Sequence, residues 1–243
     1  MNKKKKGIIL AGGKGTRFHP ITLEIPKPLI TVKKKPLINY SIETFARHGI
    51  KDIKVIIKPA DHEDYRKWMK VYGDDFAADD ISIDILEEAE PMGTFGFIVH
   101  HLADWAGDDD FFLTNSDDIK DVDLGAMQVA HKKTGAAATI ALTQVAAPED
   151  YGVVVLEGTL VKKFLEKQKN PPGNTISIGM YILSSKAVKY ASESVRKGQK
   201  FIMIEKDIFP VMAAEGTLQG FIHNGTFYDC GTLEKWAKMI QEL

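Results

Sequence analysis

The sequence has little cysteine and no long apolar run. Cys230 is the only cysteine among 243 residues, so no internal disulfide can form, which is typical of an intracellular protein. No stretch approaches the roughly 20 apolar residues of a membrane span. The basic start, Lys3 to Lys6, precedes too few apolar residues for a signal peptide. We therefore expect a soluble, cytoplasmic protein with no membrane partner.

An excess of charge of one sign is also absent. Lysine and arginine number 32 against 33 aspartates and glutamates, for a net charge of -1. Without a broad cationic field, the chain does not favour nucleic acid or a membrane surface as a partner. The sequence shows no internal repeat and no hexapeptide β-helix tail. Its composition, 44% hydrophobic and 27% charged, is that of a globular chain able to bury the core of one domain.

In the first part of the chain, apolar runs of strand length alternate with segments of helical period. The predicted strands are 7–11, 53–57, 81–86 and 111–114, and the predicted helices are 37–49 and 61–72. This alternation is typical of an α/β fold, in which right-handed crossovers make the strands largely parallel.

After about residue 135 the sequence becomes rich in strands separated by turn signals. The predicted strands are 138–145, 151–157, 160–166 and 175–183, and two closing helices are predicted at 186–196 and from 233 to the end. We interpret this part as a substrate-side subdomain within one domain spanning residues 1–243.

A glycine-rich loop follows the first predicted strand. Gly12, Gly13 and Gly15 allow backbone amides to approach a phosphate, and the end of a parallel strand is where α/β folds bind ligands. The loop is not a dinucleotide fingerprint, because Phe18 stands where a third glycine would open a helix, and it is not a P-loop. A plain tight turn is the alternative. Arg17 favours a polyphosphate site, because a guanidinium beside exposed amides clamps phosphates.

Lys27 lies between two prolines, which restrict the backbone on both sides and aim its ammonium reproducibly. Together with the loop, the segment "LAGGKGTRFHPITLEIPKPLITVKKKPLI" closely resembles the start of the sugar-1-phosphate nucleotidyltransferases, also called NDP-sugar pyrophosphorylases. The resemblance continues through "EPMGTFG", "NSDD", "EDYGVV", "FLEK", "SIGMYIL", "EKDIFP" and "YDCGT".

The resemblance implies a GT-A-like, Rossmann-like three-layer α/β sandwich with a mostly parallel central sheet and a small strand-rich sugar-binding subdomain. Residues 1–135 would form the nucleotide-binding part, and 136–243 the sugar-phosphate-binding part with the C-terminal helix. The implied reaction converts an NTP and a sugar 1-phosphate to an NDP-sugar and pyrophosphate, with Mg²⁺ as cofactor.

The resemblance also assigns site residues. Arg17 and Lys27 would act as catalytic cations, because negative charge grows on the transferred group and on the leaving pyrophosphate. Residues around the nucleotide would be Leu10, Ala11, Gly12, Gly13, Gly15, Thr16, Glu88, Gly93 and Thr94. Residues around the sugar phosphate would be Gly152, Glu166, Lys167, Ser177 and Gly179.

Two aspartates are the expected ligands of the Mg²⁺ ion, which prefers carboxylate oxygens. Asp117 belongs to "NSD", which is similar to the family's Asn-Gly-Asp turn, and Asp229 belongs to "YDCGT". Ser116 replaces the glycine of that turn, so Asp118 is a second candidate beside Asp117.

Glu88, five residues before Gly93, is the expected reader of the base. A carboxylate offers acceptors only, which suits the adjacent N1–H and N2–H₂ donors of guanine better than uracil or thymine. The run "EEAEPMGTFG" is most like the GDP-mannose pyrophosphorylase branch, so GTP with mannose 1-phosphate is favoured. Glucose-1-phosphate thymidylyl or uridylyl transfer is the alternative.

Two other functions use similar residues. A GT-A glycosyltransferase has no pyrophosphate leaving group to neutralise, so Arg17 and Lys27 weigh against it. A non-catalytic, sugar-nucleotide-binding regulatory subunit is expected to lack phosphate or metal residues, whereas Arg17, Lys27, Asp117 and Asp229 are all present. The sequence leaves open which sugar is used and whether the protein forms a homo-oligomer.

Overall fold

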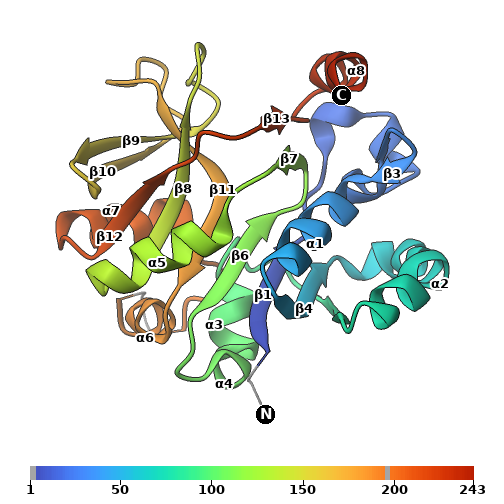
Figure 1. The fold of residues 1–243 in the computed structure, drawn as a ribbon, viewed down its shortest axis with the longest axis horizontal. Coiled ribbons are helices and arrows are strands. Elements are labelled where there is room, and N and C mark those ends of the chain that lie inside the picture. Colours follow the sequence, from blue (N-terminus) through green and yellow to red (C-terminus); the bar gives the residue numbers. More distant parts are fainter. Residues whose placement is uncertain (1–3, 195–197) are drawn as a thin grey trace. The chain divides into compact units, whose positions relative to one another are not determined.

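The structure, a computed structural model, describes residues 4–194 and 198–243. The chain forms two compact units, each assembled from separate stretches of sequence (Figure 1). The first unit comprises Met1–Ala89, Thr114–Val122 and Gly225–Leu243, and the second comprises Glu90–Leu113 and Asp123–Asn224. The functional division near residue 135 stays a prediction.

The first unit contains a parallel sheet. Strands β1 (Lys5–Leu10), β4 (Ile50–Ile57) and β5 (Ser82–Glu87) lie in the order β5-β4-β1. Helix α1 (Leu37–Arg47) packs on β1, where a Cβ at Gly7 would lie only 2.6 Å from the ring of Phe45. The parallel arrangement predicted for the first part of the chain is therefore present in this unit.

Helix α2 (His62–Ala78) is longer than predicted, because it passes through Gly73 instead of ending there. The ring of Trp68 lies 6.5 Å from that of Tyr72 and 5.6 Å from that of Phe76, so aromatic packing continues past the glycine. This packing outweighs the roughly 1 kcal/mol that a glycine costs in a helix interior. The preceding turn is the 3₁₀ helix η4 (Pro59–Asp61).

The first unit also contains several short elements and the C-terminal helix. They are the 3₁₀ helices η1 (Thr16–Phe18), η2 (Ile21–Leu23) and η3 (Lys27–Leu29), the pair β2 (Thr31–Val32) and β3 (Lys35–Pro36), the antiparallel pair β7 (Asp118–Lys120) and β13 (Phe227–Asp229), and helix α8 (Leu233–Glu242). A buried apolar cluster joins Phe18, Ile119, Cys230 and Met239. Segments from three distant parts of the sequence thus share one core.

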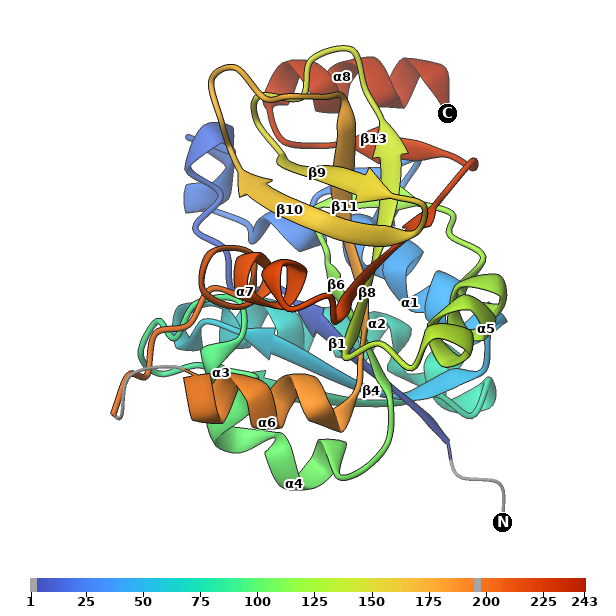
Figure 2. The same cartoon turned by 90° about the vertical axis from the view of Figure 1, so that its left-hand side faces the viewer.

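The second unit contains a sheet of mixed direction. Strands β8 (Ala138–Gln144), β9 (Gly152–Glu157), β10 (Leu160–Glu166), β11 (Thr175–Leu183) and β12 (Leu218–Ile222) lie in the order β11-β8-β12-β10-β9. Among these five strands as the structure describes them, β12 and β8 pair in parallel; β11 pairs antiparallel with β8 and β9, and β10 pairs antiparallel with β9 and β12. Figure 2 shows β9 and β10 running side by side as a hairpin.

The expectation of a mostly parallel sheet is therefore wrong, and the expectation of an α/β fold is confirmed. Parallel neighbours need a crossover of a dozen or more residues, whereas short turns join antiparallel neighbours. Two residues, Gly158 and Thr159, separate β9 from β10, and such a connection imposes the antiparallel direction.

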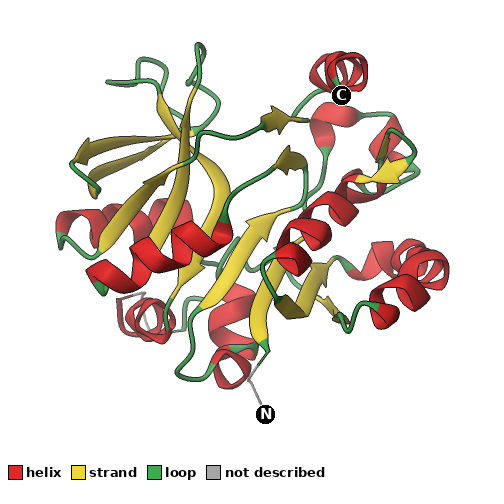
Figure 3. Ribbon diagram, in the orientation of Figure 1, coloured by secondary structure: helices red, strands yellow, loops and turns green. Residues whose placement is uncertain are grey.

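The second unit also contains helices (Figure 3), of which α6 was predicted and the others were not. They are α3 (Gly96–His101), α4 (Ala103–Ala106), α5 (Leu124–Thr134), α6 (Ser185–Ser194), the π-helical turn η5 (Ile204–Ile208) and α7 (Phe209–Ala214). The predicted strand 111–114 is β6 (Phe111–Asn115), which begins in this unit. Helix α6 matches the predicted 186–196 helix to residue 194; the rest of that prediction lies outside the described residues. No helix within residues 4–194 and 198–243 is both long and apolar enough to cross a membrane.

Candidate functional site

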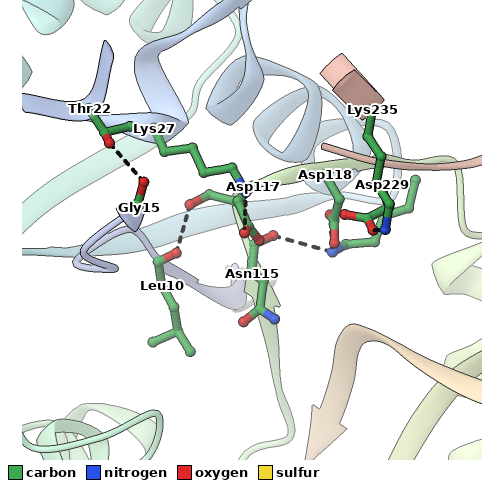
Figure 4. Close-up of polar contacts among 11 residues, drawn as sticks. Leu10, Gly15, Thr22, Lys27, Asn115, Asp117, Asp118, Asp229 and Lys235 are labelled. Atoms are coloured by element: carbon green, nitrogen blue, oxygen red, sulfur yellow. Dashed lines mark hydrogen bonds and ion pairs between the residues drawn. The ribbon is translucent and has the colours of Figure 1, made fainter. Parts of the chain in front are cut away.

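The glycine loop leaves the carboxyl end of β1 in the first unit. The amide of Ala11 donates to Ile56 O at 2.8 Å, which continues the parallel pairing beyond Leu10. Gly15 has a φ of +61°, a conformation that favours glycine, and its carbonyl accepts from Thr22 Oγ1 at 2.7 Å (Figure 4). A Cβ at Gly13 would meet no atom within 4 Å. That glycine therefore borders open space into which a ligand could approach.

The predicted phosphate-binding side chains of this loop are accessible. Thr16 and Arg17 are exposed, whereas the adjacent Phe18 is fully buried and anchors η1 in the apolar cluster. The loop therefore has a fixed base and a polar, solvent-facing edge. This arrangement suits an anion that arrives from solution.

Lys27 and Asp117 form an ion pair within the first unit. Lys27 Nζ lies 2.7 Å from Asp117 Oδ2, with side-chain exposures of 8% and 43% respectively. The ammonium also lies 5.1 Å from the centre of the Phe18 ring, a cation–π distance. The structure thus brings the predicted cation and the predicted metal ligand together, and it holds the lysine in a buried position.

Ser116, which stands where the related turn has glycine, has a structural role. Its Oγ donates to Leu10 O at 2.7 Å and so ties the "NSDD" turn to the end of β1. Glycine has no side chain with which to form this bond. The substitution therefore adds an anchor between the glycine loop and the turn that carries Asp117.

Asp118 differs from its neighbour in environment. Its Oδ1 lies 2.5 Å from Lys120 Nζ, and both side chains are buried. Burial raises the pKa of Asp118 to about 7; Lys120 lowers this pKa, while the nearby charges of Asp117 and Asp229 raise it. Because the Asp117 side chain is half-exposed and that of Asp118 is buried, Asp117 is the more accessible of the two candidate ligands.

Asp229 lies opposite Asp118 in the β13–β7 pairing. Its Oδ2 is 2.5 Å from Lys235 Nζ on α8 (Figure 4). A Cβ at Gly231 would lie 2.8 Å from Asp229 Oδ1 and 3.4 Å from Arg17 Nη1, so this carboxylate and the Arg17 guanidinium both border Gly231. The first unit therefore gathers Arg17, Lys27, Asp117 and Asp229.

These carboxylates fit a hard divalent cation held jointly with phosphate oxygens. In the part of the chain that the structure describes, no three histidine, cysteine, aspartate or glutamate side chains are grouped as a complete metal cage. Mg²⁺ is commonly bound by one or two carboxylates plus substrate phosphates and water, which does not need such a cage. The charges of Asp117 and Asp229 both raise the pKa of Asp118, so the three carboxylates lie close enough to influence one another.

Glu88 lies at the carboxyl edge of the parallel sheet of the first unit. It follows β5 directly, its amide donates to Ile57 O at 2.8 Å, and its side chain is half-buried. The preceding Glu87 is exposed and contacts His62 through its carboxylate. The backbone of Glu88 is therefore fixed beside β4, where ligands of α/β sheets bind.

The other residues predicted to bind nucleotide, Gly93 and Thr94, belong to the second unit. Gly93 has a φ of +77°, and a Cβ there would lie 2.4 Å from Ile202 O. Thr94 Oγ1 donates to Glu205 Oε2 at 2.6 Å and accepts from the amide of Ile204 at 3.0 Å. The structure thus brings Thr94 to Glu205, a contact that the sequence did not indicate.

The predicted sugar-phosphate residues also lie in the second unit. Gly152 pairs with Glu166 across the β9–β10 hairpin, and a Cβ at Gly152 would lie 2.5 Å from the Phe164 ring and 3.1 Å from Glu166 Oε2. Lys167 has a φ of +48°, and its Nζ lies 3.6 Å from Glu166 Oε1. The Glu166 side chain is only 14% exposed, whereas that of Lys167 is 62% exposed.

Ser177 and Gly179 lie at an irregularity in β11. The register with β8 shifts between Ser177 and Tyr181, and Gly179 has a φ of +66°. The amide of Gly179 contacts Ser177 Oγ at 3.4 Å. Such a bulge re-aims local backbone groups, which is a common feature beside ligand sites.

Glu205 is a buried acid that sequence reasoning missed. Burial raises its pKa, Thr94 lowers this pKa through its hydrogen bond, and the charge of Glu166 raises it further. Tyr181 Oη lies 3.5 Å from Glu205 Oε1. The residue is part of "EKDIFP", one of the segments that carry the family resemblance. That segment could have drawn attention to Glu205, but the sequence did not indicate its hydrogen-bond partners, which are distant in the chain.

Two lysines of the first unit were also missed, Lys120 and Lys235. A signal for Lys235 existed in the sequence, because Thr232 caps α8 by accepting from the amide of Lys235. A threonine before an amphipathic run predicts a helix start, and such a start places position 235 in the first turn of the helix.

Comparison with known proteins identifies relatives. The nucleotidyl transferase family model matches residues 6–243. Mannose-1-phosphate guanyltransferases of Yarrowia lipolytica and Saccharomyces cerevisiae are 36% and 34% identical, each over 93% of this chain. The chain spans about three fifths of these relatives, 60% and 61% of their lengths.

Solved structures agree in fold. A Bacillus anthracis protein described as a glucose-1-phosphate thymidylyltransferase, in complex with a sucrose, has a TM-score of 0.86 and 25% identity, covering 98% of this chain and 94% of its own. A UDP-glucose pyrophosphorylase complexed with UDP-glucose has a TM-score of 0.80 and 23% identity, covering 99% and 98% respectively, and shows likeness of fold alone.

Proposed function

Because the chain belongs to the nucleotidyl transferase family, we propose that it transfers a nucleotidyl group from an NTP to a sugar 1-phosphate and releases pyrophosphate. The observation that supports this most is the cluster of the first unit. An accessible glycine loop with Arg17 adjoins the Lys27–Asp117 pair and the carboxylate of Asp229. The two cationic side chains suit the phosphate groups of an NTP, and the two carboxylates suit the divalent cation that accompanies them.

The chemistry requires cations more than a base. A phosphate oxygen of the sugar 1-phosphate is already anionic; it forms a bond to the α-phosphorus, while the bond from that phosphorus to the bridging oxygen breaks and its electron pair leaves with pyrophosphate. Arg17, exposed beside the loop, would neutralise the leaving group. Lys27, held over Phe18, would face the transferred phosphoryl group as a preorganised charge.

Asp117 and Asp229 would hold a divalent cation, Mg²⁺. When bound, this ion neutralises phosphate oxygens and holds the triphosphate in one geometry. The exposure of Asp117 allows it to accept such an ion from solution. Asp118, buried against Lys120, would support the turn instead of binding the ion directly.

On the sugar side, Glu166 would accept hydrogen bonds from sugar hydroxyls, and Lys167 would pair with the sugar phosphate. Gly152 lets the Phe164 ring and Glu166 pack close to its backbone. The exposure of Lys167 and its contact with Glu166 support this pairing of roles. Ser177 and Gly179 would present polar groups of the β11 bulge to the hexose.

For the substrates, we propose GTP and mannose 1-phosphate. The names of the two fungal relatives support this choice, as does the carboxylate of Glu88, which matches the two donors of the guanine edge. The second candidate is dTTP or UTP with glucose 1-phosphate, which the description of the Bacillus anthracis structure supports.

The test is a substrate matrix. The purified protein is incubated with Mg²⁺, each of several NTPs and each of several sugar 1-phosphates, and pyrophosphate release is measured. We expect release with GTP and mannose 1-phosphate, and none when either substrate is omitted. Release with dTTP or UTP and glucose 1-phosphate would select the second candidate.

Two results would contradict the transferase itself. Hydrolysis or transfer from an NDP-sugar without pyrophosphate formation would indicate a glycosyltransferase. Binding of an NDP-sugar with no release under any combination of substrates would indicate a regulatory subunit.

A further inference from the structure

The two candidate cation ligands are paired with lysines of different character. Lys27, the partner of Asp117, is 8% exposed, lies on the Phe18 ring and is flanked by prolines. Lys235, the partner of Asp229, is 37% exposed and projects from the first turn of α8. A buried ammonium loses much by leaving its carboxylate, whereas a half-exposed one can regain hydration in water.

Asp229 is thus the carboxylate whose cation can be exchanged. Its Oδ2 faces Lys235 Nζ at 2.5 Å, while its Oδ1 borders Gly231, next to Arg17. An ammonium at this distance neutralises part of the charge of the carboxylate that would bind a divalent ion. A divalent cation and Lys235 would therefore compete for the negative charge of Asp229.

We propose that Lys235 is an exchangeable counter-ion of Asp229, which a divalent cation must displace in order to bind. The inference deepens the proposed function, since it takes Asp229 to be a cation ligand of the site. Lys235 acts here through Asp229 and is a positioning residue. Its effect is to keep the affinity for free divalent cation low, so that the cation binds chiefly when polyphosphate oxygens supply further ligands.

The exchange of Lys235 for a divalent cation involves no covalent change and no proton transfer. The divalent cation arrives with two positive charges, the ammonium of Lys235 stays protonated and moves into solvent, and no bond other than the ion pair is broken. Because one partner is half-exposed, the competition weakens as ionic strength rises.

The test uses Mn²⁺ as a probe of the full chain in the absence of nucleotide. Free and bound Mn²⁺ are distinguished by electron paramagnetic resonance at low ionic strength. We expect Lys235→Met, which keeps the apolar stem and removes the charge, to bind Mn²⁺ about tenfold more tightly than the parent protein. Lys235→Arg should bind Mn²⁺ with the parent affinity. Added salt should reduce the difference in Mn²⁺ affinity between Lys235→Met and the parent protein.

Two further variants test the mechanism of the gain. Lys238→Met is the matched control, because Lys238 lies on the same helix and pairs with Glu242 at 3.6 Å; it should leave Mn²⁺ affinity unchanged. Asp229→Asn in the Lys235→Met background should abolish the gain. Lys235→Gln replaces Lys235→Met if circular dichroism shows that the latter is unfolded.

An equal or weaker affinity in the charge-removing variant overturns the inference, and so does the absence of Mn²⁺ binding by every protein. A gain that survives Asp229→Asn also overturns it. The proposed function stands or falls separately, since it is decided by pyrophosphate release. Pyrophosphate release without a change in Mn²⁺ affinity in Lys235→Met would contradict only the proposed role of Lys235. A change in Mn²⁺ affinity without pyrophosphate release would contradict only the proposed transferase activity.

Discussion

Close ion pairs fix the candidate site residues of the first unit, whereas close packing and hydrogen bonds contribute more in the second unit. In the first unit, Lys27 and Lys235 each lie within 2.7 Å of a carboxylate oxygen. In the second, Gly152 leaves room for the Phe164 ring, and Glu205 is buried among hydrogen-bond donors. Charged side chains are suited to binding a polyphosphate, whose charge distribution changes during the reaction. Closely packed groups are suited to binding a neutral sugar ring, whose hydroxyls must be distinguished.

The largest effect is expected at the carboxylates of the first unit. Asp117→Asn and Asp229→Asn should each lower Mg²⁺-dependent pyrophosphate release on the order of a thousandfold, because each removes an anionic oxygen and keeps the shape. Asp118→Asn should be milder, since that side chain is buried against Lys120. The measurement is turnover across a Mg²⁺ titration. Equal turnover in parent and variant would show that the residue is not a cation ligand.

The cations should come next. Arg17→Ala and Lys27→Ala should lower kcat roughly a hundredfold, or about 3 kcal/mol, because both charges face groups that become more negative in the transition state. Single-turnover kinetics separate this effect from a change in KM for the NTP. A change confined to KM would show that both residues act in ground-state binding. It would contradict the idea that the charges of the first unit act on the transition state.

Shape is tested at Gly152. Gly152→Ala would place a Cβ 2.5 Å from the Phe164 ring, so it should raise the KM for sugar 1-phosphate and cost about 1–3 kcal/mol of unfolding free energy. Gly173→Ala is the control in the same unit, because a Cβ there meets no atom within 4 Å. Urea unfolding and steady-state kinetics measure the two effects. If both variants had the same unfolding free energy and the same KM for sugar 1-phosphate, close packing at Gly152 would not determine sugar binding.

A smaller effect concerns pH and Glu205. Burial raises its pKa in the folded protein, so the native state holds this proton more tightly than the unfolded chain does. Stability from this group is present below its ordinary pKa and is lost as pH rises through the raised value. Glu205→Gln should therefore gain stability relative to the parent as pH increases. Thermal unfolding from pH 4 to pH 8 measures the difference; a constant difference would contradict the raised pKa.

The smallest signal is expected from Cys230. Burial raises the pKa of this thiol to about 12, and the side chain is inaccessible in the apolar cluster of the first unit. At pH 8 roughly one molecule in ten thousand would carry the thiolate. A thiol reagent should react with the urea-unfolded protein and very slowly with the folded one. Rapid reaction of the folded protein would show that this core opens, and with it the contacts around Phe18.

Local patterns in the sequence were sufficient for much of the fold, whereas the roles of the site residues stay predictions. The apolar runs 7–11, 53–57 and 81–86 became neighbouring parallel strands, since burial of a strand on both faces needs a continuous apolar run. The assignments of Arg17, Lys27 and Asp117 came from family resemblance, and the ion pair of Lys27 with Asp117 agrees with them geometrically.

Only the tertiary structure decided how Asp117 and Asp118 differ, and which distant groups meet. Adjacent aspartates look alike in sequence, but β7 buries Asp118 beside Lys120, two residues along on the same face of the strand. Asp117 precedes the strand and stays half-exposed. The bond from Ser116 to Leu10 joins positions 106 residues apart, and Lys235 reaches Asp229 because α8 follows β13. Sequence periodicity determines which face of an element is apolar. The partner of a buried charge depends on which elements pack together, and that is settled only when the whole core has folded.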